Sequence, residues 1–156
     1  MRKYKHVIFA EGNGITRAPM AAEIFKTLYH GDADVWSRGI LVQFPEPLNQ
    51  KAEAVMISNG ITLDEFESKK LTAEDITPDT IVFTMEDASL AKILSNIETA
   101  DEDNTFILTD YVGEELPIMN PFGGTLQTYG ICFEMLKTTL GKLAVMLEDL
   151  EKSEGL

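Results

Sequence analysis

The sequence predicts an α/β protein whose parallel sheet is covered by helices on both faces. Short apolar runs of strand length alternate with segments whose apolar residues keep helical spacing, which is the pattern of buried strands joined by helices. The length of 156 residues suits one domain with a substantial core, and 44% hydrophobic with 25% charged residues is ordinary for a globular protein. We therefore expect a single domain over residues 1–151, followed by a frayed tail at residues 152–156.

A glycine-rich loop joins the first predicted strand to the first predicted helix. Residues 7–10 form a short apolar run typical of a buried strand, and residues 18–29 carry apolar side chains on one helical face. Pro19 fits the first helical turn, where its missing N–H is not needed. Residues 11–17 lie between them, at the carboxyl edge of the sheet, where ligands bind in open α/β proteins.

Three more strands and three more helices are predicted downstream. The strands are expected at residues 34–37, 80–84 and 105–109, and the helices at residues 48–59, 88–97 and 125–150. Thr72 and Asp75 have the spacing of a capping box, which predicts a short turn. Residues 110–124 are expected to form a loop before the last helix.

Charge and cysteine content exclude several kinds of function. With 26 acidic and 13 basic side chains the net charge is −13, and no basic stripe is present, which disfavours binding to nucleic acid or to an anionic membrane. No stretch has the length of a membrane span, and the first apolar run is too short for a signal peptide, so we expect a cytoplasmic protein. Cys132 is the single cysteine and no metal-ligand spacing is present, so we expect no disulfide, no metal and no cofactor.

The loop at residues 11–17 has the features of an anion-binding site. Its backbone N–H groups and the positive end of the following helix can converge on one point. Gly12 and Gly14 permit a positive φ, and Arg17 can donate two parallel hydrogen bonds to an oxyanion. Glycine-rich turns between a strand and a helix are common, so an ordinary tight turn is an equal alternative from these residues alone. The carboxylate of Glu11 is unexpected at the first position of such a site.

Four segments of the chain resemble low-molecular-weight protein tyrosine phosphatases. "VIFAEGNGITRAPMA" resembles the family signature of a strand followed by C-x5-R-S-P, and three later motifs follow in the family order: "WSRGI", "KKLTAEDITPDTIVFTME" and "NPFGGTLQTYGICFEMLKTTL". The last motif has the form seen in the bacterial branch that includes protein arginine phosphatases. The resemblance implies a three-layer α/β/α fold with a four-stranded parallel sheet in the order 2-1-3-4.

The resemblance also implies which residues form the site. The phosphate-binding loop would consist of Gly12, Asn13, Gly14, Ile15, Thr16, Arg17 and Ala18. Tyr111 and Phe122 fall on segments that border the pocket in the family, where they would stack on a ligand, although packing beneath the loop is an equal alternative. Glu11 stands at the position of the family's cysteine nucleophile, and Asn120 at that of the aspartic acid that protonates the leaving group. Ala18 replaces a serine that helps to stabilise the thiolate.

Three placements of the Glu11 side chain follow from its position. The carboxylate can fill the loop as a built-in phosphate mimic facing Arg17, turn out to solvent, or attack phosphorus as a nucleophile. Nucleophilic attack is disfavoured because glutamate carries its oxygens into the volume that the phosphate would occupy. The amide of Asn120, in addition, has no acidic proton for a leaving group.

The sequence therefore favours a pseudophosphatase, a catalytically impaired member of the family that binds a phosphoprotein or another protein partner. Two other functions stay open. One is an active phosphatase of weak or altered activity toward phosphotyrosine or phosphoarginine. The other is a regulatory or dimerisation subunit with a vestigial pocket, and nothing in the sequence specifies an oligomeric state.

Overall fold

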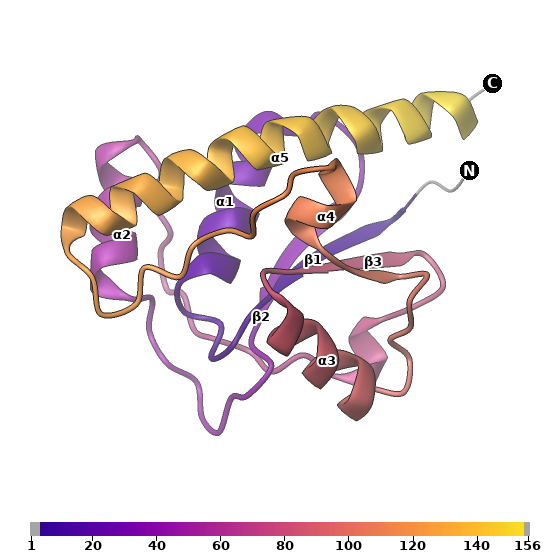
Figure 1. Ribbon diagram of the computed structural model, residues 1–156, viewed down its shortest axis with the longest axis horizontal. Helices are drawn as coiled ribbons and strands as arrows, with labels where there is room; N and C mark the ends of the chain where they lie inside the picture. Colours follow the sequence, from indigo (N-terminus) through magenta and orange to yellow (C-terminus); the bar gives the residue numbers. More distant parts are fainter. Residues whose placement is uncertain (1–3, 155–156) are drawn as a thin grey trace.

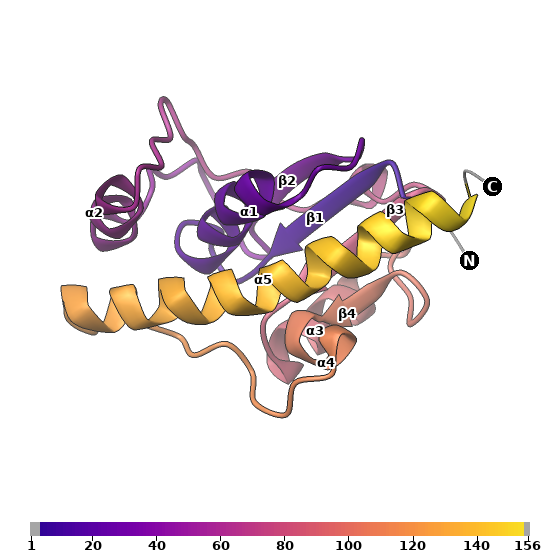
Figure 2. The ribbon, with the colours of Figure 1, turned by 90° about the horizontal axis from the view of Figure 1, so that it is seen from above.

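A four-stranded parallel sheet forms the centre of the computed structural model, which describes residues 4–154 (Figures 1 and 2). The strands are β1 (His6–Ala10), β2 (Asp34–Arg38), β3 (Thr80–Thr84) and β4 (Thr105–Ile107). They lie in the order β2-β1-β3-β4, and each neighbouring pair is parallel. The predicted α/β class and the strand order 2-1-3-4 are confirmed.

Helices cover both faces of the sheet, so that the fold has three layers (Figure 1). Successive side chains of β1 point to opposite faces. Val7 and Phe9 enter the larger core, which also contains residues of α1 (Arg17–Leu28), α2 (Gln50–Ser58) and α5 (Leu126–Glu154). Ile8 and Ala10 enter a smaller core that includes residues of α3 (Asp87–Asn96). Within residues 4–154, no helix has both the length and the apolar character needed to cross a bilayer.

The structure differs from the predicted elements mainly in its C-terminal third. The strand expected at residues 105–109 ends at Ile107, and the chain turns directly into the short helix α4 (Leu108–Val112). Leu108 is fully buried in the larger core, so packing rather than local periodicity stabilises this five-residue helix. Helix α5 continues through Glu154, so residues 152–154 of the expected frayed tail are helical, and residues 155 and 156 lie outside the described part.

A short 3-10 turn, η1 (Ala73–Asp75), precedes β3. Asp75 accepts a hydrogen bond from the backbone N–H of Thr72 at 3.0 Å. The capping box that the spacing of these two residues predicts is therefore confirmed.

Two glycines hold the loop after β1 against the segment that follows β2. Gly14 has a φ of +73°, and a Cβ at this position would lie 2.7 Å from the backbone N of Gly39. A Cβ on Gly39 would in turn lie 2.8 Å from the carbonyl group of Asn13. The carbonyl oxygen of Gly12 also accepts hydrogen bonds from the N–H groups of residues 40 and 41, at 2.7 and 2.9 Å. The two backbone segments are in direct contact, which fixes the shape of the loop.

Gly39→Ala is expected to lower the free energy of unfolding by about 1–3 kcal/mol, because the added carbon overlaps the backbone of Asn13. Gly130→Ala on α5 is the matched control. Its Cβ meets no atom within 4 Å, and its helix propensity predicts a gain of roughly 0.5–1 kcal/mol. Urea denaturation measures both changes. A Gly39→Ala variant as stable as the wild type would show that the two backbone segments can move apart without a loss of stability.

Candidate functional site

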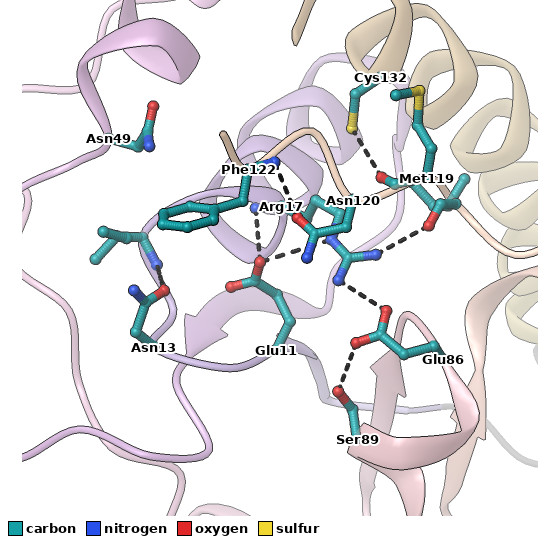
Figure 3. Close-up of polar contacts among 12 residues, drawn as sticks. Glu11, Asn13, Arg17, Asn49, Glu86, Ser89, Met119, Asn120, Phe122 and Cys132 are labelled. Atoms are coloured by element: carbon teal, nitrogen blue, oxygen red, sulfur yellow. Dashed lines mark hydrogen bonds and ion pairs between the residues drawn. The ribbon is translucent and has the colours of Figure 1, made fainter. Parts of the chain in front are cut away.

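Glu11 lies where β1 ends, and its side chain is turned into the loop. The residue is only 5% exposed, and its Oε1 accepts a hydrogen bond from the backbone N–H of Arg17 at 3.0 Å. Figure 3 shows the carboxyl group directed at Arg17. The placement of Glu11 inside the loop is confirmed, and the alternative in which it points to solvent is wrong.

Arg17 opens α1 with a buried guanidinium that is held by two other parts of the chain. Its Nη2 lies 2.7 Å from Oε2 of Glu86, and its Nη1 donates to the carbonyl oxygen of Ile118 at 2.9 Å. The hydroxyl of Ser89 donates to the other carboxylate oxygen of Glu86 at 2.8 Å and so orients it. The Nε of Arg17 lies 3.7 Å from Oε1 of Glu11, and it has no hydrogen-bond partner within residues 4–154. Only this edge of the guanidinium faces Glu11.

The surroundings of Glu11 favour its neutral form. Burial raises the pKa of Glu11 above its usual value; the Arg17 guanidinium and backbone N–H oppose this rise, and the Glu86 carboxylate adds to it. Two carboxyl groups share one guanidinium, and Glu86 has the shorter contact with it. The Oε2 of Glu11 is buried and has no hydrogen-bond partner in the described chain, so no hydrogen bond offsets the desolvation of this atom. The pKa of Glu11 is therefore raised by the burial of its carboxyl group and by the nearby Glu86 carboxylate.

Part of the loop's donor capacity is used within the loop itself. The N–H of Gly14 donates to the carbonyl oxygen of Glu11 at 2.9 Å, and the N–H of Ile15 lies 3.4 Å from Oδ1 of Asn13. The carbonyl oxygen of Ile15 accepts the N–H of Asn49, whose side chain caps α2. The loop thus has a fixed shape, but these two N–H groups are not free for an oxyanion.

Asn120 and Phe122 lie over the loop in Figure 3. Asn120 is exposed, and its Oδ1 accepts the backbone N–H of Phe122 at 3.1 Å, so the amide closes a turn of its own segment. The ring of Phe122 is 72% exposed beside the site. Tyr111 is elsewhere, because α4 carries its ring back against Phe83 and Phe106, with centroids 5.1 and 4.9 Å away. Tyr111 is therefore a packed residue of the fold and not a residue of the pocket rim.

Glu86 is the site residue that the sequence analysis misses. An acidic pair at residues 86 and 87 resembles an ordinary solvated surface, but Glu86 holds Arg17 more closely than Glu11 does. A signal was present, because Glu86 follows β3, the neighbour of β1, and the carboxyl ends of parallel strands meet at one edge. The carbonyl group of Ile118 gives no such signal, since it belongs to the irregular segment between α4 and α5.

Cys132 is buried on α5, behind the site. Its Sγ lies 3.6 Å from the carbonyl oxygen of Met119, to which the thiol donates, and burial raises its pKa to about 12. A thiol with such a pKa is not a nucleophile near neutral pH. Cys132 is therefore a packed thiol of the fold.

Comparison with known proteins identifies the family. The sequence profile of the low molecular weight phosphotyrosine protein phosphatase family matches residues 6–154. This chain belongs to that family. The match includes both the β1–α1 loop and the segment before α5, which together form the site.

Individual relatives of the chain are bacterial phosphatases. The protein-arginine-phosphatase of Geobacillus stearothermophilus is 28% identical over 146 residues, which are 93% of this chain and 97% of that protein. PtpB, a low molecular weight protein-tyrosine-phosphatase of Staphylococcus haemolyticus, is 28% identical over 127 residues, 81% of this chain and 88% of that protein. The solved structure of the YwlE arginine phosphatase from G. stearothermophilus has a TM-score of 0.86 at 26% identity, covering 95% and 96% of the two chains.

Glu11→Gln is expected to stabilise the protein by an amount that grows with pH. Because the pKa of Glu11 is raised in the folded state, its stabilising contribution is complete below the usual value of 4.5 and is lost as the pH rises through the raised pKa. The amide carries no charge at any pH, so its advantage appears above about pH 4.5 and levels off once Glu11 is ionised. Urea denaturation across this range measures the difference, with the exposed Glu134→Gln as control. A difference that does not change with pH would contradict this account.

Removing the Glu11 side chain is expected to create oxyanion binding. Glu11→Ala leaves the backbone N–H and the Nε of Arg17 facing vacated volume, whereas Glu11→Gln keeps that volume filled without charge. We expect inorganic phosphate to bind the alanine variant at least about tenfold more tightly than the wild type, with the glutamine variant resembling the wild type. Calorimetric titration measures all three. Tight binding by the glutamine variant would show that charge, and not occupancy, excludes phosphate.

Proposed function

We propose that this chain is a pseudophosphatase, which keeps the phosphatase fold, does not hydrolyse phosphoesters efficiently and acts by binding another protein. The observation that carries the proposal is the hydrogen bond from the Arg17 N–H to the inward-turned carboxyl group of Glu11. By the motif resemblance, Glu11 stands at the nucleophile position of the family. A carboxyl group held there competes with a phosphoryl group for the same donor, and its neutral form is a poor nucleophile.

The chain also lacks the acidic residue that protonates the leaving group in the family mechanism. The resemblance places the general acid at Asn120, whose amide has no acidic proton to give to a leaving group. The Oδ1 of Asn120 is already engaged with the N–H of Phe122. The loss of both the nucleophile and the acid supports a role in binding.

The competing function is a phosphatase of weak or altered activity, because the relatives are phosphatases that act on protein tyrosine or arginine by name. It would require Glu11 either to leave the loop or to attack phosphorus itself. The Oε2 of Glu11 is inaccessible to solvent, so a substrate cannot reach this atom without movement of the site. A regulatory or dimerisation subunit would instead use a surface away from the loop.

We place the protein in the cytoplasm. Its one cysteine is a buried free thiol, which suits a reducing compartment. The net charge of −13 supports a partner other than nucleic acid or an anionic membrane.

The direct test is hydrolysis of p-nitrophenyl phosphate by the wild type beside Arg17→Ala. p-Nitrophenolate leaves with little help from an acid, so the assay examines Glu11 independently of Asn120. We expect the same background rate from both proteins. Wild-type turnover that disappears in Arg17→Ala would overturn the proposal and identify an enzyme with an unusual nucleophile.

Restoring the family residues is expected to restore activity in two steps. Glu11→Cys should hydrolyse p-nitrophenyl phosphate but act poorly on phenyl phosphate, whose leaving group needs a proton. Adding Asn120→Asp should raise phenyl phosphate hydrolysis by about 10²–10⁴-fold, with little change for the nitrophenyl ester. Asn96→Asp, an exposed amide on α3, is the matched control in the Glu11→Cys background. Full activity on phenyl phosphate from Glu11→Cys alone would contradict the role assigned to Asn120.

A further inference from the structure

A cleft of about 610 Å³ lies on the α3 side of the sheet. One wall is the segment that leads into η1, and the other is the C-terminal end of α3. Its apolar lining includes Ile40, Leu71 and Ile97, and its charged lining consists of Lys70, Lys92 and Glu98. The volume falls within the range of about 300–1,000 Å³ that is usual for sites of small molecules.

The cleft is built on buried side chains and backbone hydrogen bonds. Leu71 and Ile97 are 1% and 9% exposed and belong to the smaller core of the fold. The N–H of Leu71 donates to the carbonyl oxygen of Gly39 at 2.8 Å, which ties one wall to the chain after β2. The hydroxyl of Thr99 donates to the carbonyl oxygen of Ala73 at 2.8 Å, which joins the two walls. The floor is therefore preformed.

The two lysines of the cleft have no ion-pair or hydrogen-bond partner among the described residues, as is also true of Lys69 and Lys137. Within residues 4–154, Lys70 and Lys92 take part in no ion pair and donate no side-chain hydrogen bond, whereas Lys5, Lys26 and Lys142 pair with carboxylates. The two unpaired ammonium groups make the cleft locally positive, although the net charge of the protein is −13. Glu98 is the one acidic side chain in the lining, so the charged groups of the cleft sum to one positive charge.

We propose that this cleft binds a small amphipathic anion, in which a carboxylate, sulfate or phosphate group is attached to an apolar body. The apolar body would lie against Ile40 and Leu41, of which Leu41 is 69% exposed, and the anionic group would face Lys70 and Lys92. A small molecule suits this cleft better than a second copy of the chain, because the volume lies in the range that is usual for small-molecule sites. The proposal does not depend on what Glu11 does.

The test uses 8-anilinonaphthalene-1-sulfonate, a dye that joins a sulfonate to aromatic rings and fluoresces in apolar surroundings. N-phenyl-1-naphthylamine, which has the same rings without the charge, is the matched ligand. We expect the double variant Lys70→Gln/Lys92→Gln to weaken sulfonate binding by roughly three- to thirtyfold, and Glu98→Gln to strengthen it. Lys137→Gln, an exposed lysine on α5, should change nothing, and the uncharged ligand should bind all variants alike.

The place of binding is checked on the same samples by amide chemical shifts. We expect the dye to shift the amides of Leu71, Ala73 and Ile97, and octanoate, but not octanol, to displace it. All substituted residues are exposed, so a thermal melt is enough to show that each variant is folded. Unchanged affinity in the double lysine variant would overturn the proposal. So would chemical shifts confined to the groove on α5 around Ile131 and Met135.

Discussion

One buried guanidinium, shared by two carboxyl groups, organises the carboxyl edge of this sheet. Arg17 joins the loop through Glu11, the end of β3 through Glu86, and the segment before α5 through Ile118. Because Glu86 has the shorter contact, Glu11 receives the weaker share of the positive charge, and burial decides its pKa. An arrangement that would otherwise be an open anion site is thus occupied by a carboxyl group whose pKa is raised by burial.

Much of the fold could be predicted because most elements have a strong local pattern. The strand Thr80–Thr84 has three consecutive apolar residues between two threonines, and its predicted limits agree with the structure. The order of the strands cannot be predicted from the periodicity of the sequence. It is implied by the resemblance of four motifs to those of the family. Helix α4 could not be predicted from the sequence. Its five residues are stabilised by the burial of Leu108, which depends on contacts with residues distant in the chain.

The site divides in the same way into local and distant parts. Glu11 and Arg17 are six residues apart on one loop, so their proximity could be read from the sequence. The contact of Arg17 with Ile118 joins residues that are 101 positions apart, and no local sequence pattern predicts it. The protonation preference of Glu11 depends on burial and on Glu86, and both are products of the complete fold.

The contact between Gly14 and Gly39 bears on how this chain can change over generations. Any side chain at either position would overlap the opposite backbone, so folding alone is enough for selection to keep both glycines. Gly14 of the loop would then be inherited even by a lineage that has no phosphate to bind, whereas a Cβ on Gly12 would meet no atom within 4 Å. The presence of Gly14 is therefore explained by packing alone. Evidence of catalytic descent or loss must come instead from positions 11 and 120.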